Sequence, residues 1–262
     1  MSDYEVAYRG LEITGLDVYQ RYAEDITAGR AQELMSEMNA DVPLGGSSME
    51  YGRREEAPLV VYIHGGSWQI GTHLDSIGSA KVQYLTEKGY AFTTVNFTLF
   101  PKATVKEQVQ EIAGSVGFLV KNAARLGFDP ARIILMGHSS GAHVATLLGT
   151  DSSYLEKEGL DLDIIAAVIA LDGSNYNALG DLIDSPGSVA NNMLHALGKD
   201  PMVLKDMSPT CHASKPNAKA FLFLHVQRHG GVRQAVELVT ILKAIGTKAD
   251  FHVFKGLSLR VM

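Results

Sequence analysis

Short apolar runs recur along the chain, and between them apolar residues return every three or four positions. The runs are rich in β-branched and aromatic residues, and such near-continuous hydrophobicity is typical of parallel strands buried on both faces. They predict strands at 59–63, 91–95, 133–136, 164–171, 220–226 and 251–254. The amphipathic spacing between them predicts helices at 76–88, 105–126, 142–148 and 232–245.

Strands that alternate with helices of this length imply crossover connections and a mostly parallel central sheet with helices on both faces. The chain shows no internal repeat and no low-complexity linker, so we expect residues 1–262 to form a single α/β domain. Within residues 1–50 we expect an N-terminal helical segment, because apolar residues from 11 to 38 have helical spacing. Residues 174–214 contain no clear strand and many small polar residues, as in a lid or substrate-facing insertion.

Composition narrows the classes of function. The chain has 46% hydrophobic and 20% charged residues, as in globular proteins, and its net charge of -6 gives no basic surface for nucleic acid. No apolar run approaches the roughly 18 residues that span a bilayer, and the N-terminus lacks a signal-peptide core, so no membrane association is expected. The single cysteine, Cys211, favours a cytoplasmic setting. Its neighbour His212 raises the idea of a Cys-His nucleophile, for which coincidence is the alternative.

The motif GHSSG at 137–141 lies between a predicted buried strand and a predicted helix. A strand, tight turn and helix in this order form a nucleophile elbow, which holds a serine hydroxyl above the edge of the sheet. The turn strains the backbone of Ser139, so its neighbours at 137 and 141 must be small. A helix-entry turn with a capping serine is the structural alternative. We expect Ser139 to be a nucleophile.

The motif HGGSW at 64–68 directly follows the predicted strand at 59–63. Glycines let a loop turn its N–H groups inward, and a loop in this position supplies the oxyanion hole of hydrolases with a nucleophile elbow. We expect the amides of Gly66, Ser67 and Ser140 to surround the oxyanion, with His64 and Gly65 supporting the loop. A simple glycine turn after a strand is the alternative.

HGGSW and GHSSGAH together resemble the HGGxW branch of the α/β-hydrolases, which includes kynurenine formamidases and related carboxylesterases. The segment VNFTLFP at 95–101 and the turn GFDP at 127–130 add to the similarity, which covers about 59–254. The resemblance implies an α/β-hydrolase fold and an acyl-enzyme at Ser139, formed from a small carboxylic ester or an arylformamide. It implies no metal and no organic cofactor, and it places Trp68 in the substrate pocket.

The sequence departs from this family where the proton-transfer partners are expected. A serine hydroxyl needs a histidine to take its proton and an acid to orient that histidine. The acid normally follows the strand at 220–226, where this chain reads QRHGG, and the histidine normally follows the last strand, where it reads KGLSLR. Leu259 stands where histidine is expected, and the usual final helix is absent, so the fold is expected to be C-terminally shortened. Residues 51–58 also leave little room for the usual preceding strand. Genuine substitutions, truncation or a reading-frame error each explain the two windows.

Other residues are candidate replacements. Asp172 ends the strand next to that of the elbow and is the candidate substitute acid, with a turn-forming Asp-Gly as the alternative. His229 lies in the turn where the acid is expected and is the candidate substitute base. His225 and His252 lie on the last two predicted strands, and a structural role is the alternative for all three histidines.

Two functional hypotheses follow from these motifs. The first is a serine hydrolase that acts on a small-molecule ester or amide, with turnover weakened by the missing partners. The second is a catalytically inactive hydrolase fold that serves as a binding protein. A metal-dependent enzyme is not indicated, because no H-E-x-x-H motif and no acidic cluster accompany the nine histidines. The sequence does not indicate an oligomeric state.

Overall fold

The computed structural model of the protein describes residues 6–8, 11–13, 57–75, 77–184, 187–214 and 216–255. Its strands form one sheet in the order β1-β2-β4-β3-β5-β6-β7-β8. The strands are β1 (Val6–Tyr8), β2 (Leu11–Ile13), β3 (Leu59–Ile63), β4 (Ala91–Val95), β5 (Ile133–His138), β6 (Ile165–Leu171), β7 (Ala220–Val226) and β8 (Lys248–Phe254). The six strands from β3 to β8 pair in parallel, whereas β1 and β2 add an antiparallel edge next to β4.

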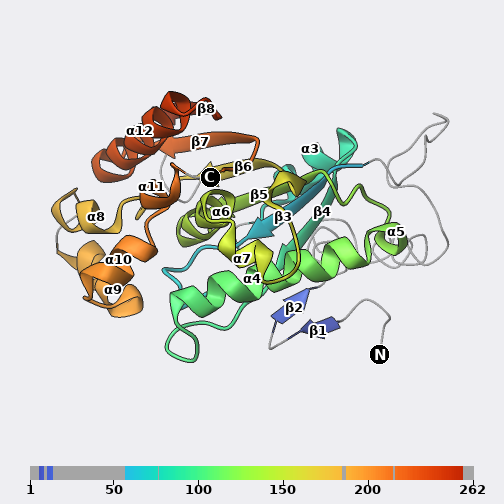
Figure 1. The fold of residues 1–262 in the computed structure, drawn as a ribbon, viewed down its shortest axis with the longest axis horizontal. Coiled ribbons are helices and arrows are strands. Elements are labelled where there is room, and N and C mark those ends of the chain that lie inside the picture. The colour runs from blue at the N-terminus through green and yellow to red at the C-terminus, as the bar shows by residue number, and fades with distance from the viewer. Residues whose placement is uncertain are drawn as a thin grey trace.

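Helices connect the parallel strands and cover the sheet (Figure 1). The longer ones are α3 (Ser79–Glu87), α4 (Val105–Lys121), α6 (Ser140–Thr150), α9 (Ser188–Leu197) and α12 (His229–Ala244). The shorter ones are α5 (Ala123–Leu126), α7 (Ser153–Glu156), η2 (Leu162–Ile164), α8 (Ala178–Asp184), α10 (Pro201–Asp206) and α11 (Pro209–His212). Among the described residues, no helix combines the length and apolarity needed to cross a bilayer.

Alternating side chains of the strands divide the core between the two faces of the sheet. In β3, Val61 and Ile63 belong to the larger cluster, which α4, α6 and α12 cover, and Val60 and Tyr62 belong to a smaller cluster beside Val82 of α3. Both faces of the strand are therefore fully buried, which explains its uninterrupted apolar sequence. The mostly parallel α/β fold expected from the sequence is confirmed.

Most predicted elements lie where the hydrophobic pattern places them. The strands at 59–63, 91–95 and 220–226 have the expected bounds, and the helix predicted at 105–126 divides into α4 and α5. At the N-terminus the prediction is wrong, because residues 11–13 form strand β2 and pair with β4. The rest of that predicted helix lies outside the described residues. Two strands, β1 and β2, precede β3 in the chain, and most of the segment 51–58, where little room for a strand was expected, lies outside the described residues.

The predicted insertion at 174–214 contains the four helices α8 to α11, of which α8, α9 and α10 lie together at one end of the molecule (Figure 1). Helix α9 contacts the loops that follow β3 and β4, through Gln69 and Phe100. Because the carboxyl ends of parallel strands share one edge, these helices lie against the edge of the sheet that carries the HGGSW and GHSSG loops.

Candidate active site

Ser139 sits in the turn between β5 and α6, in a backbone conformation that L-residues rarely adopt. Its φ is 54° and its ψ is −119°, and its amide donates a hydrogen bond of 2.9 Å to the carbonyl oxygen of Leu171. Such strain costs about 1–3 kcal/mol and persists only where the surroundings impose it. The side chain is half-buried, so solvent reaches it. This is the geometry of a nucleophile elbow.

The glycines on either side of Ser139 are required by close backbone contacts. A Cβ on Gly137 would lie 2.1 Å from the carbonyl oxygen of Gly141, and a Cβ on Gly141 would lie 2.2 Å from that of Ile63. Neither contact can be relieved by a flexible side chain, because both partners are backbone atoms. The glycine spacing of the GHSSG motif thus follows from how tightly the turn packs on itself and on β3.

The HGGSW loop packs directly against this elbow. A Cβ on Gly65 would lie 3.1 Å from the Cβ of Ser139, and the amide of Trp68 donates to the Oγ of Ser140 at 3.4 Å. The two strands that carry the motifs, β3 and β5, are neighbours, and Ile63 pairs with Gly137 at their carboxyl ends. Two motifs far apart in the sequence therefore form one site.

Three backbone amides beside Ser139 have no acceptor among the described residues. The amides of Gly66 and Ser67 donate to no described group, and that of Ser140 begins helix α6, where an intrahelical acceptor does not exist. The loop holds φ values of 121° at Gly66, 53° at Ser67 and 63° at Trp68. Free donors in a strained loop next to a serine are what an oxyanion hole requires.

His64 contacts the HGGSW loop, which the sequence predicts it to support. Its Nδ1 lies 2.7 Å from the carbonyl oxygen of Gly65, and its ring stacks on Phe97 with centroids 4.4 Å apart. Because that partner is a carbonyl, Nδ1 must carry a proton and donate it. Burial lowers the pKa of His64, which favours the neutral ring.

Trp68, which the sequence predicts to lie in the substrate pocket, is largely buried in the structure. Its side chain is only 3% exposed and packs edge-on against His143, with ring centroids 5.3 Å apart. Its carbonyl oxygen accepts hydrogen bonds from the amide of Phe100 and from Nε2 of Gln108. Trp68 therefore anchors the HGGSW loop in the core.

Asp172 lies at the end of β6 with a φ of 46° and is fully buried. Its Oδ1 lies 3.2 Å from Nδ1 of the equally buried His225, and its Oδ2 lies 3.5 Å from Nη2 of Arg228. The same guanidinium donates to the carbonyl oxygen of Asp172 at 2.8 Å. All three residues lie on β6, on β7 or just after β7, so the described partners of this carboxylate are on the side of β7, away from β5 and Ser139.

His229, the candidate substitute base, is the first residue of α12 and is exposed, and among the described residues it has no hydrogen bond to Ser139 or Asp172. All nine histidines of the chain fall within the described residues, and none of them hydrogen-bonds to the Ser139 side chain. His252 is exposed on β8, and His143 is fully buried with its Nε2 donating to the carbonyl oxygen of Met207. The structure therefore brings the predicted nucleophile Ser139 and the HGGSW loop together, but no histidine hydrogen-bonds to the Ser139 side chain among the described residues.

Cys211 does not have the surroundings of a reactive thiol. Partial burial raises the pKa of its thiol, which reduces the thiolate fraction. The neighbouring His212 directs Nε2 to the carbonyl oxygen of Asp206 at 2.8 Å and Nδ1 toward Asp151 at 3.5 Å. These contacts favour the alternative given above, that Cys211 and His212 are neighbours in the sequence by coincidence.

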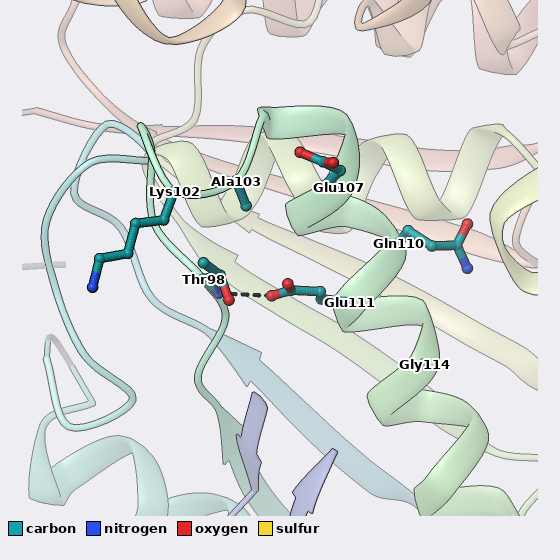
Figure 2. Close-up of a pocket in the computed structure, with 7 residues that line it drawn as sticks. All are labelled: Thr98, Lys102, Ala103, Glu107, Gln110, Glu111 and Gly114. Carbon is teal, nitrogen blue, oxygen red and sulfur yellow. Dashed lines mark hydrogen bonds between the residues drawn. The ribbon is translucent and has the colours of Figure 1, made fainter. Parts of the chain in front are cut away.

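A cleft of about 390 Å³ lies away from these motifs, between the loop after β4 and helix α4. Its lining residues are Thr98, Lys102, Ala103, Glu107, Gln110, Glu111 and Gly114 (Figure 2). Glu111 accepts a hydrogen bond of 2.7 Å from the amide of Thr98, so this carboxylate fixes the loop that follows β4. In the part of the chain that the structure describes, no group of three His, Cys, Asp or Glu side chains is arranged to hold a metal ion.

Comparison with known proteins agrees with this fold and loop geometry. A family model described as BD-FAE matches residues 49–236. The chain belongs to the BD-FAE family. This family is part of the α/β-hydrolase superfamily, so the predicted superfamily is confirmed.

Relatives of this BD-FAE domain are named as esterases. The isoprenylcysteine alpha-carbonyl methylesterase ICME of Arabidopsis thaliana is 27% identical over 213 residues, which cover 76% of this chain and 49% of that protein. The carboxylesterase NlhH of Mycobacterium tuberculosis is 28% identical over 95 residues, 36% of this chain and 30% of that protein. The chain thus spans about half the length, or less, of these curated relatives.

Among solved structures, the apo form of Thermogutta terrifontis esterase 2 is similar in fold. Its TM-score is 0.63 at 18% sequence identity, and the match covers 80% of this chain and 76% of that one. At this identity the likeness establishes the fold alone.

Proposed function

We propose that this BD-FAE domain is a serine hydrolase of small carboxylic esters, with Ser139 as the nucleophile. The observation that supports the proposal is the close approach of Gly65 to the strained Ser139, next to a loop whose amides at Gly66 and Ser67 have no acceptor among the described residues. The esterase names of the relatives support the same reaction class.

In the proposed reaction, Oγ of Ser139 attacks the ester carbonyl carbon. A new O–C bond forms, the carbonyl oxygen takes the negative charge, and the three amides donate hydrogen bonds to it. Collapse of this intermediate breaks the bond to the alkoxide, which leaves as an alcohol after it gains a proton. Because no histidine hydrogen-bonds to Ser139, the serine proton passes to solvent, which reaches this half-buried side chain.

The absence of a histidine beside Ser139 predicts slow turnover. A serine and an oxyanion hole without their partners retain roughly 10³–10⁴-fold catalysis over water, far below an intact triad. Water must also be activated for deacylation, so the second step slows as well. We therefore expect the acyl-enzyme on Ser139 to accumulate with activated esters.

The test is acylation of purified protein by p-nitrophenyl acetate, followed by nitrophenolate release and intact mass. We expect a burst of about one equivalent, a mass increase of one acetyl group on Ser139, and a slow steady state. Neither the burst nor the adduct should form in Ser139→Ala. An equal steady-state rate of nitrophenolate release in wild type and Ser139→Ala, with no acetyl adduct, would overturn the serine mechanism.

Three substrate types separate the finer possibilities. A small activated ester tests the general activity, and an arylformamide tests the activity implied by the HGGxW motif. A methyl ester of an isoprenylated cysteine tests the activity for which the Arabidopsis thaliana relative is named. We expect the activated ester to react fastest, because its leaving group needs no protonation.

The second candidate function is a binding protein built on an inactive hydrolase fold. The positions of the nine histidines favour it, since none hydrogen-bonds to the Ser139 hydroxyl. A fluorophosphonate probe discriminates the two functions, because formation of the Oγ–P bond with loss of fluoride requires a nucleophilic serine. Labelling that is lost in Ser139→Ala supports the hydrolase, and unlabelled wild-type protein supports the binding protein.

A further inference from the structure

The oxyanion loop is strained at Ser67, and only part of it is anchored in the core. Ser67 and Trp68 have φ values of 53° and 63°, in a region that costs a non-glycine residue about 1–2 kcal/mol. Trp68 is held from below, by Ser140, Gln108 and the amide of Phe100. Ser67 is exposed, and its carbonyl oxygen accepts a hydrogen bond from Nε2 of Gln69 at 3.2 Å.

Gln69 also reaches the helix that lies over this loop. Its Nε2 lies 3.3 Å from the carbonyl oxygen of Asn192, and its Oε1 lies 2.8 Å from Nδ1 of His195, both on α9. The amide orientation is fixed by its partners, because a nitrogen that faces two carbonyl oxygens must donate to both. Oε1 then faces the imidazole, so Nδ1 of His195 is the donor of that bond.

A second contact joins the same helix to the same loop. The ring of His195 packs edge-on against Phe100 with centroids 5.0 Å apart, and the amide of Phe100 donates to the carbonyl oxygen of Trp68 at 2.9 Å. His195 therefore contacts Gln69, which holds the Ser67 carbonyl, and Phe100, whose amide holds the Trp68 carbonyl. These contacts are exposed, so they can break and re-form without opening the core.

We propose that Gln69 is a positioning residue that couples helix α9 to the oxyanion hole. While α9 is docked, Gln69 holds the Ser67 carbonyl, and this fixes the backbone of Ser67 with its amide toward Ser139. When α9 moves away, Gln69 loses both partners on the helix and the strained Ser67 backbone relaxes. Lid closure over a bound ester thus completes the donor set. This proposal rests on the proposed function, since it assigns the Ser67 amide to the oxyanion.

The variants Gln69→Leu, Gln69→Glu and His195→Ala separate the parts of this connection. Leucine removes all three hydrogen bonds at similar size. Glutamate still accepts from His195 but cannot donate to the carbonyl oxygens of Ser67 and Asn192. His195→Ala removes the bond to Oε1 of Gln69 and the contact with Phe100, and it keeps the bonds from Gln69 to the carbonyl oxygens of Ser67 and Asn192. Gln83→Leu is the matched control, because Gln83 makes an exposed hydrogen bond to Glu87 on α3.

The first measurement is the inactivation of each protein by a fluorophosphonate probe, resolved into probe affinity and maximal labelling rate. We expect Gln69→Leu and Gln69→Glu to lower the maximal rate roughly tenfold or more, as displaced oxyanion donors do. His195→Ala should lower it less, and Gln83→Leu should match wild type. Melting temperatures should stay close to wild type, because the hydrogen bonds lost are exposed.

The second measurement does not depend on Ser139 chemistry. Hydrogen–deuterium exchange of the peptide that contains residues 65–70 should be faster in Gln69→Leu than in wild type and in Gln83→Leu. Wild-type labelling rates together with unchanged exchange in Gln69→Leu would overturn the proposed coupling. If the wild type itself is not labelled, the proposed function fails. In that case faster exchange in Gln69→Leu would still support the connection between the HGGSW loop and α9, and unchanged exchange would overturn that connection as well.

Discussion

Gly65 packs against Ser139 so closely that an added Cβ would come 3.1 Å from the serine Cβ and 2.9 Å from the carbonyl oxygen of His138. The HGGSW loop, which we propose to supply the oxyanion donors, and the turn that carries Ser139, the proposed nucleophile, thus lie in direct contact. A methyl group between them should separate the two.

Gly65→Ala should therefore reduce labelling of Ser139 by a fluorophosphonate more than tenfold. The overpacked methyl group should also destabilise the fold by about 1–3 kcal/mol. Gly117→Ala serves as control, since its added Cβ would meet the Glu158 side chain at 3.3 Å, where the neighbour can move. Labelling rates and urea denaturation check both effects, and an unchanged labelling rate in Gly65→Ala would contradict the contact.

Ser139→Gly should be more stable than Ser139→Ala by about 1–3 kcal/mol. Both variants lose the nucleophile, but only glycine adopts a φ of 54° without steric cost. Urea denaturation of the two inactive variants measures the strain stored at the elbow. Equal midpoints and equal slopes would show that the turn is not strained in solution.

Arg228→Met should destabilise the fold by about 2 kcal/mol or more, because the guanidinium compensates the buried Asp172 carboxylate and donates to two carbonyl oxygens. Arg233→Met is the matched control, since Arg233 pairs with Glu237 through side chains that are 43% and 29% exposed. Exposed pairs contribute about 0–1 kcal/mol. Similar losses in the two variants would refute a special role for Arg228.

Stability should fall as the pH drops from about 6.5 to about 4, in part because of His143. Burial lowers the pKa of this histidine from 6.5 to about 4 in the folded protein, so the unfolded chain binds the proton more readily in that window. Its contribution, lost below the folded pKa, is about 3 kcal/mol. In His143→Gln the difference in unfolding free energy between pH 7 and pH 4.5 should shrink, and an identical difference would contradict this assignment.

Residues whose roles follow from local backbone physics were predictable. The apolar runs of β3 and β7 and the glycines of the HGGSW and GHSSG loops can be recognised in the sequence, because burial and tight turns restrict the choice of amino acid. Gln69 was not predictable, since it acts through partners on α9 more than 120 positions away in the chain. The surroundings of Trp68 were not predictable, because an aromatic residue next to a glycine loop suits a pocket wall and a core anchor equally. In the structure its ring packs against His143.

The N-terminal residues show the limit of periodicity. Residues 11–13 belong to the segment 11–38, whose apolar residues have helical spacing, yet they form a strand next to β4. Pairing with the unpaired N–H and C=O groups at the edge of the sheet stabilises a strand there more than the local spacing stabilises a helix. His225 and Asp172 could be seen as strand ends, but their mutual pairing depends on the register between β6 and β7.

The turn at Ser139 is held by backbone contacts with β3 and β6, and the imidazoles near the HGGSW loop (His64, His143 and His195) contact the loop or its supports and make no hydrogen bond to the Ser139 side chain. Charge stabilisation and proton relay are thus physically independent modules in this fold. A general base introduced near the Ser139 hydroxyl would meet a scaffold already arranged for the transition state, so a gain in turnover would require only placement of one proton acceptor.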